Sequence, residues 1–267
     1  MVDDCFSSKI EINNVDCIEG LKSIKNNSID LVFTSPPYYN AKNYSHWDSY
    51  KDYLKFLEDV FVSVFDVLKE GRMCVVNISA IIQPREKRSM ESKRLAIPFH
   101  FVSLMEDIGF KFLEDIIWLK PEGSAKNRNG GFFNHRQPIA YKPNIVNEYV
   151  FVFQKPMSGL IDKILRKYKG EIRELSLVKD DYEKTNVWHI VPEQNSKHPA
   201  PFPVELSDKI VKYYSYVGDT VLDPFIGSGT LAVSCKKLKR NCVGFEIHKE
   251  YVDMAKNRLK AIDKHKL

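Results

Sequence analysis

A glycine-rich turn between a predicted strand and a predicted helix, near the end of the 267-residue chain, most constrains the fold. The turn reads Asp223-Pro224-Phe225-Ile226-Gly227-Ser228-Gly229-Thr230. Glycines two positions apart let the backbone turn tightly and approach a ligand closely. Glu246 stands at the end of the following predicted strand, where a carboxylate can accept hydrogen bonds from both hydroxyls of a ribose. The sequence therefore predicts a site for an adenosine-containing ligand.

The turn alone leaves the kind of ligand open. Together with Ala232 it also satisfies the loose dinucleotide pattern G-x-G-x-x-A, so a nicotinamide cofactor remains an alternative. A nicotinamide-binding fold normally opens with this turn and builds several strands after it. Here the chain has room for only one more strand and helix, so the other strands must precede the turn. We expect a circularly permuted order, in which residues 10–21, with Asp16 and Cys17 at a strand end, supply the next strand of the site.

Short apolar runs alternate with helical patterns along the chain, which is typical of βαβ units and a largely parallel sheet. The predicted strands cover residues 29–33, 73–78, 112–119, 148–153, 220–222 and 242–245, and the predicted helices cover residues 50–68, 97–108, 204–216, 231–238 and 251–262. Gly71 is expected to end the first of these helices. Residues 155–184 interrupt the alternation. We therefore expect an α/β catalytic domain formed by residues 1–154 and 187–267, with a small insert at residues 155–186.

A second motif, Ser35-Pro36-Pro37-Tyr38, follows the predicted strand at residues 29–33. It lies at the edge where open α/β sheets bind ligands. The two prolines leave carbonyl groups that cannot join a regular strand ladder. The Ser35 oxygen and the Pro36 carbonyl could accept hydrogen bonds from the exocyclic amine of a planar base, while Tyr38 stacks on the ring. Taken by itself, the string is also compatible with a rigid turn that binds nothing.

Together the two motifs resemble those of the amino-methylating DNA methyltransferases, whose signatures are S/D/N-P-P-Y/F and F-x-G-x-G. The order, with the Pro-Pro-Tyr turn first and the glycine turn last, resembles the permuted β class of that family. A further matching stretch is His198-Pro199-Ala200-Pro201-Phe202-Pro203. The resemblance implies a Rossmann-like methyltransferase sheet, S-adenosylmethionine as methyl donor, double-stranded DNA as substrate, and a target base flipped out of the stack.

The resemblance also implies roles for individual residues. Ser35, Pro36, Pro37 and Tyr38 would form the catalytic turn, and the cofactor would contact Asp16, Cys17, Phe202, Asp223, Phe225, Gly227, Ser228, Gly229, Thr230 and Glu246. Within this set, Asp16 and Cys17 would lie near the adenine, Glu246 at the ribose and Phe202 near the methionine. Ser35 is the form typical of enzymes that methylate cytosine N4, whereas adenine N6 enzymes mostly carry Asp. Cytosine N4 is the expected target, and adenine N6 remains the alternative.

Methyl transfer by such a site needs no covalent intermediate. Two acceptors on the amine would localise its lone pair toward the methyl group, so positioning and electrostatics would supply most of the acceleration. No cysteine follows a proline, so the Pro-Cys nucleophile of C5-cytosine methylation is absent. Methylation of RNA or of a protein amide, a non-catalytic nucleic-acid-binding protein and a nicotinamide oxidoreductase remain alternatives.

The net charge of +5, from 40 Lys+Arg against 35 Asp+Glu, is too small to identify a partner. The basic residues instead collect in residues 84–94 and 120–142. Glycines, amides, cations and two adjacent aromatics in the second stretch suit a loop that meets phosphates and base edges. The expected DNA contacts are Lys126, Arg128, Arg136, Arg85 and Arg88. The insert at residues 155–186 is the other candidate for target recognition.

The remaining features set the expected cellular context. Five scattered cysteines with no C-x-x-C spacing argue against a disulfide framework and a structural zinc site, and no metal is expected. No apolar run is long enough to span a bilayer, and the first residues show no signal-peptide pattern. A cytoplasmic enzyme is therefore expected, as a monomer or a homodimer. A cognate restriction endonuclease is a possible partner.

Overall fold

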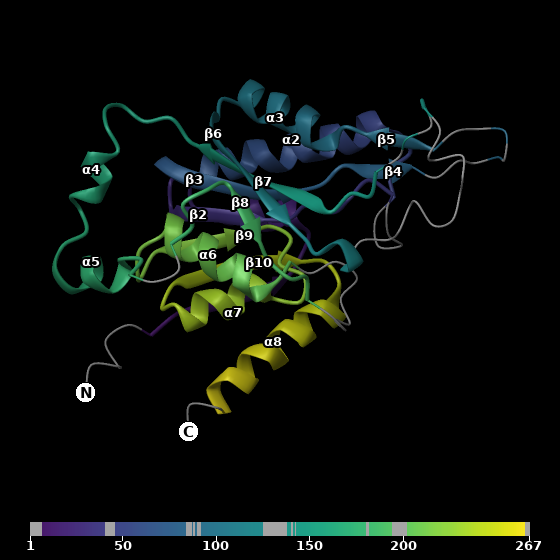
Figure 1. Ribbon diagram of the computed structural model, residues 1–267. Coiled ribbons are helices and arrows are strands. Elements are labelled where there is room, and N and C mark those ends of the chain that lie inside the picture. The colour runs from purple at the N-terminus through teal and green to yellow at the C-terminus, as the bar shows by residue number, and fades with distance from the viewer. Residues whose placement is uncertain are drawn as a thin grey trace.

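A mixed sheet flanked by helices forms the centre of the molecule (Figure 1). The computed structural model describes residues 7–40, 46–83, 87, 89, 92–124, 138–139, 141, 143–179, 182–193 and 202–264. Within these residues the main sheet has eight strands in the order β1-β10-β9-β2-β3-β7-β6-β8. The expected α/β fold is confirmed.

Five neighbouring strands of this sheet are parallel. They are β1 (Ile10–Asn14), β10 (Asn241–Glu246), β9 (Thr220–Asp223), β2 (Ile29–Thr34) and β3 (Leu68–Ile78). The strands β9 and β10, last in sequence, lie between β1 and β2, so the expected permuted order is present. We call the edge where β1, β2, β9 and β10 end the carboxyl edge, and the opposite edge the amino edge.

The other three strands extend the sheet beyond β3. The strand β7 (Asn147–Gln154) runs antiparallel to both β3 and β6 (Lys111–Leu119), while β8 (Val187–His189) runs parallel to β6. Because β7 is reversed, it begins at the carboxyl edge and ends at the amino edge. A separate two-stranded sheet of β4 (Ile81–Gln83) and β5 (Lys93–Leu95) follows β3, and the short helix η1 (Glu122–Ser124) follows β6.

Helices cover both faces of the sheet. On one face lie α2 (Tyr50–Val67) and α3 (Ile97–Ile108), and on the other lie α6 (Val204–Tyr214), α7 (Thr230–Lys237) and α8 (Lys249–Lys264) (Figure 1). The short helix α1 (Cys17–Lys22) packs against α2 on the first face. In β2, Val32 packs on the α2 side while Leu31 and Phe33 pack on the α6 side. The side chains of a strand buried on both faces are mostly apolar, which explains the apolar run Leu31-Val32-Phe33, while the buried Asp30 pairs with Arg72. No helix in the described part of the chain is long and apolar enough to cross a membrane.

The end of α2 differs from the sequence prediction. The helix stops at Val67, and Gly71 lies inside β3 with φ +72° rather than ending the helix. The carbonyl groups at the end of the helix find their hydrogen-bond partner in Lys155. Its buried Nζ donates to the carbonyl oxygens of Phe65 (2.6 Å) and Leu68 (2.8 Å). A cation suits a helix C-terminus because the unpaired carbonyls there carry partial negative charge.

The insert leaves the sheet at the amino edge. It follows the end of β7 and contains α4 (Asp162–Leu165) and α5 (Gly170–Ser176). Figure 1 shows α4 and α5 at one end of the strands and β4 and β5 at the other. The insert therefore lies far from the carboxyl edge.

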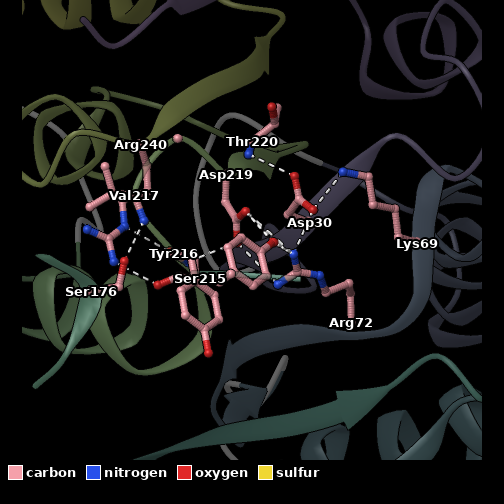
Figure 2. Close-up of polar contacts among 12 residues, drawn as sticks. Asp30, Lys69, Arg72, Ser176, Ser215, Tyr216, Val217, Asp219, Thr220 and Arg240 are labelled. Carbon is pink, nitrogen blue, oxygen red and sulfur yellow. Dashed lines mark hydrogen bonds and ion pairs between the residues drawn. The ribbon is translucent and has the colours of Figure 1, made fainter. Parts of the chain in front are cut away.

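A buried polar network anchors the insert to the sheet (Figure 2). Arg72 bridges Asp30 (2.9 Å) and Asp219 (3.2 Å). Asp30 is the second residue of β2, and Asp219 directly precedes β9, the strand beside it. Tyr168 donates to Asp219 (2.7 Å) and stacks on Tyr216, with ring centroids 3.7 Å apart. The Ser176 hydroxyl also accepts a hydrogen bond from the Val217 amide (2.9 Å). A buried arginine of this kind is stable only because two carboxylates compensate its charge.

Candidate active site

A cavity opens at the carboxyl edge, between the ends of β1, β2, β9 and β10. Its wall includes twelve of the fourteen residues expected for the catalytic turn and the cofactor. These are Asp16, Cys17, Ser35, Pro36, Pro37, Tyr38, Phe202, Phe225, Gly227, Ser228, Thr230 and Glu246. Segments that are far apart in the sequence meet here because the carboxyl ends of parallel strands share one edge of the sheet.

The Pro-Pro-Tyr turn begins where β2 ends. Thr34, the last residue of β2, is fully buried, and its hydroxyl donates a 2.6 Å hydrogen bond to Oδ1 of Asp223 at the end of β9. The turn then brings Ser35 and Tyr38 to the cavity wall. The Tyr38 hydroxyl donates to Oε2 of Glu148 (3.1 Å). The two motifs are therefore joined directly at their starting points.

The glycine turn has the tight backbone conformation that its sequence predicts. Gly227 and Gly229 have φ values of 49° and 81°, a region that favours glycine. A Cβ atom on Gly229 would also lie 2.6 Å from Cβ of Ala255 in α8. Arg258 of α8 braces the turn by donating to the Ser228 carbonyl (3.0 Å) and to the Thr230 hydroxyl (3.1 Å). The turn is therefore held in shape by contacts within the chain.

Asp223 supports the site from behind the cavity wall. Its side chain is 1% exposed, and Oδ1 also accepts from the Phe225 amide (2.9 Å). Oδ2 has no hydrogen-bond partner among the described residues. Burial raises the pKa of the Asp223 carboxyl to about 7, although the hydrogen bond from Thr34 opposes the shift. Asp223 therefore orients the turn and does not line the cavity.

Glu246 and Asp16 place two carboxylates on the cavity wall. The backbone amide of His248 donates to Oε1 of Glu246 (2.8 Å), which orients this carboxylate at the end of β10. Burial raises the pKa of Glu246, and backbone hydrogen bonds oppose this shift. Asp16 caps α1 by accepting from the Ile18 amide (2.9 Å). Burial and then Asp16 raise the pKa of the neighbouring Cys17 to about 12, so this cysteine is a neutral thiol and not a nucleophile.

Some expected residues lie elsewhere. Asp223 and Gly229 are behind the wall rather than on it. The expected DNA contacts Lys126, Arg128, Arg136, Arg85 and Arg88 lie outside the described residues. Several wall residues were not expected from the sequence, namely Trp47, Phe56, His248 and Tyr251. They sit on helices or loops with no motif of their own, so no spacing in the sequence would have identified them.

Comparison with known proteins identifies the class. Residues 29–257 match the N6/N4 family of DNA methylases. The type II β methyltransferase M.BslI of Bacillus sp. (strain NEB-606) is 30% identical, over 94% of this chain and 27% of that much longer protein. The type II methyltransferase M.HpaI of Haemophilus parainfluenzae is 29% identical, over 91% of this chain and 71% of its own length. The chain belongs to the N6/N4 DNA methylase family, and it is a DNA methyltransferase.

Solved structures agree with this assignment. A DNA modification methylase of Thermus thermophilus, complexed with S-adenosyl-L-methionine, superimposes with a TM-score of 0.74 at 29% identity, over 94% of this chain and 92% of that one. The cytosine-N4-specific PvuII methyltransferase matches with a TM-score of 0.68 over 95% of this chain and 87% of that one, and at 22% identity this likeness concerns the fold alone. The family uses S-adenosylmethionine, as the sequence led us to expect.

Proposed function

We propose that the chain transfers the methyl group of S-adenosylmethionine to N4 of a cytosine flipped out of duplex DNA. One observation supports this most strongly: Ser35 and Tyr38 of the Pro-Pro-Tyr turn line the same cavity as Phe225, Gly227 and Glu246. A turn suited to an exocyclic amine and a turn suited to an adenosine-containing cofactor thus face one space.

The donor set of the cavity fits S-adenosylmethionine. Glu246 presents an oriented carboxylate for the ribose hydroxyls, and the aromatic rings of Phe225 and Phe202 offer apolar surface. When bound, the cofactor supplies an electrophilic methyl group on sulfur.

The residues of the chain hold and orient the target amine. The Ser35 hydroxyl oxygen and the Pro36 carbonyl would accept the two amine hydrogens and direct the nitrogen lone pair at the methyl carbon. The nitrogen–carbon bond forms as the carbon–sulfur bond breaks, and the amine then loses one proton to water. Tyr38 would stack on the flipped base. Cys17 takes no part, because its raised pKa keeps it protonated.

The preference for cytosine rests on Ser35, where enzymes acting on adenine mostly carry Asp. Mass spectrometry of nucleosides tests it, with DNA methylated by the purified chain and DNA treated with a Ser35→Ala variant as the control. N4-methylcytosine in the first sample alone supports the proposal. N6-methyladenine instead would move the target to adenine within the same family, and the absence of both products would refute the proposed reaction.

For the DNA contacts we propose the carboxyl edge rather than the insert. Residues 120–124, where the basic stretch at residues 120–142 begins, follow β6 at that edge, and Lys120 forms an ion pair with Glu148 there. The insert at residues 155–186 is anchored at the amino edge through Tyr168. We therefore assign the insert a structural role in closing the amino edge, in place of the target recognition expected from the sequence.

The relatives named as type II methyltransferases support a place in restriction and modification. We propose that the chain protects DNA from a cognate restriction endonuclease. One relative, M.BamHII of Bacillus amyloliquefaciens, is named an orphan methyltransferase, so a solitary enzyme is the alternative outcome. Mapping the methylated positions in DNA from expressing cells would supply the recognition sequence, and resistance of that DNA to an endonuclease with this sequence would test the pairing.

A further inference from the structure

Behind the Pro-Pro-Tyr turn, a chain of polar contacts runs from the cavity to the strand pair β6 and β7. The Tyr38 hydroxyl donates to Oε2 of Glu148 (3.1 Å), and Lys120 forms a close ion pair with the other carboxylate oxygen of Glu148. The Lys120 ammonium also lies 4.5 Å from the ring centre of Trp118. Of the four residues in this chain of contacts, only Tyr38 belongs to one of the two sequence motifs.

The backbone holds the partners of Tyr38 in place. Trp118 and Glu148 face each other across β6 and β7, and the Lys120 amide donates to the Val146 carbonyl (2.7 Å). Trp118 is 2% exposed, and its indole nitrogen donates to the Ile190 carbonyl (2.8 Å). The Glu148 side chain is 14% exposed, and the Lys120 side chain is 20% exposed. Glu148 is thus fixed by a rigid strand pair, whereas Tyr38 lies in a turn.

The charges of this group are balanced. Glu148 accepts both the Tyr38 phenol and the Lys120 ammonium, so a largely buried carboxylate has a compensating cation. Removal of the phenol from water and the Glu148 charge both raise the pKa of Tyr38 well above 10, while a side-chain hydrogen bond with Ser35 opposes the shift. The phenol therefore stays protonated and remains a hydrogen-bond donor.

We propose that Glu148, held by Lys120, is a positioning residue that fixes the ring plane of Tyr38 for stacking on the target base. This inference rests on the proposed function, because it assumes that Tyr38 stacks on the base. Glu148 itself does not line the cavity, so it acts only through the phenol. Holding the phenol oxygen stops the ring from swinging, and because a phenol O–H prefers to lie in the plane of its ring, a fixed acceptor also favours one ring plane before the base arrives. Such preorganisation lowers the free-energy cost of forming the productive complex.

A double-mutant cycle tests this coupling. Tyr38→Phe keeps the ring and removes the hydrogen bonds of the phenol with Glu148 and with Ser35, whereas Glu148→Ala removes only the first. We expect each variant to lower kcat on the order of tenfold, with the dissociation constant for S-adenosylmethionine within about twofold of wild type. In the Tyr38→Phe background, Glu148→Ala should change kcat by less than about twofold, because the contact is already gone. Glu148→Gln, whose amide oxygen can still accept the phenol, should recover most of the activity.

The controls separate this role from general destabilisation. Glu106→Ala removes an exposed carboxylate on α3 and should leave kcat unchanged. If Glu148→Ala does not fold, Tyr38→Phe still decides, since it leaves the Glu148–Lys120 pair intact: wild-type kcat in Tyr38→Phe overturns the inference. Full additivity of the two substitutions overturns it as well.

The failure of the proposed function has a different signature. Tyr38→Ala removes the ring, so an unchanged kcat would exclude stacking by Tyr38 and, with it, the role of Glu148. A strong loss in Tyr38→Ala, combined with wild-type kcat in Tyr38→Phe and Glu148→Ala, would refute the positioning role alone. A wild-type chain that methylates no DNA would refute both.

Discussion

Thr34 and Asp223, 189 positions apart in the sequence, join the two motifs of the site through a 2.6 Å hydrogen bond. Thr34 is the last residue of β2, directly before Ser35, and Asp223 is the last residue of β9, directly before the glycine turn. Both side chains are buried, with exposed fractions of 0% and 1%. The bond therefore sets the spacing between the turn that faces the base and the turn that faces the cofactor.

Thr34→Val should test this contact without changing the side-chain volume. The variant leaves Oδ1 of Asp223 with only the Phe225 amide as a donor. Losing a hydrogen bond to a buried carboxylate should lower the free energy of unfolding by about 1.5 to 3 kcal/mol, measured by urea denaturation. Thr185→Val, at an exposed position, is the matched control. Equal stability of the Thr34 variant and the wild type would contradict a structural role for the bond.

The buried carboxyl of Asp223 should make stability depend on pH. Its pKa is raised from 3.8 to about 7 in the folded state, so the folded state binds the proton more tightly than the unfolded state. This contribution to stability is fully present below about pH 4 and is lost as the pH rises through about 7. Relative to Asp223→Asn, the wild type should lose about 3 kcal/mol between about pH 5 and pH 8.

Denaturation curves of both proteins at the two pH values give this difference directly. Asp107→Asn, on the exposed side of α3, controls for the loss of one carboxylate. A wild type that gains stability against Asp223→Asn as the pH rises would show that the sign of the shift is wrong.

Ser35→Ala should separate the chemical step from cofactor binding. Ser35 lines the cavity at the start of the Pro-Pro-Tyr turn, and the variant removes an acceptor of the target amine. The loss of one such electrostatic contact should lower kcat by about 100-fold, measured by transfer of a labelled methyl group to DNA. Calorimetry should find the affinity for S-adenosylmethionine within about twofold of wild type. Wild-type turnover in this variant would exclude the proposed role.

Glu246→Gln should weaken cofactor binding and leave the chemical step nearly unchanged, which is the opposite of the effect expected for Ser35→Ala. Glutamine keeps the shape of the side chain but cannot accept hydrogen bonds from both ribose hydroxyls with a full negative charge. The dissociation constant for S-adenosylmethionine should rise by about tenfold or more in calorimetry. Turnover at saturating cofactor should remain close to wild type. Glu250→Gln, at an exposed position in the first turn of α8, should alter neither quantity. Unchanged affinity in the Glu246 variant would place the ribose elsewhere.

DNA binding at the two edges can be compared by its salt dependence. Neutralising Lys126, Arg128 and Arg136 together should reduce the slope of log affinity against log salt by about 2 to 3, because each lost phosphate contact contributes about 0.9. The matched control neutralises three cations of the insert, Arg166, Lys167 and Arg173, and should leave the slope unchanged. The reverse result would return the DNA contact to the insert.

Local chemistry explains what the sequence determined by itself. Pro36 and Pro37 follow the end of β2, paired glycines with positive φ make the turn after β9, and the strands buried on both faces contain short apolar runs. These signals lie within a few residues of one another, so most of the long strands and helices, their permuted order, the position of the two turns and the methyltransferase class could be predicted, whereas the short strands β4, β5 and β8 were not. Glu246 belongs to this group as well, since its place at a strand end follows from the strand pattern.

Only the tertiary structure decided how distant residues meet. The reversal of β7 carries the chain to the amino edge, which places the insert there and buries Lys155 at the end of α2, where the sequence pattern had suggested Gly71 as the stop. The same reversal sets Glu148 at the carboxyl edge, beside Tyr38 and Lys120. Neither spacing nor composition records such contacts, because they depend on strand direction and on side chains that face each other across the sheet.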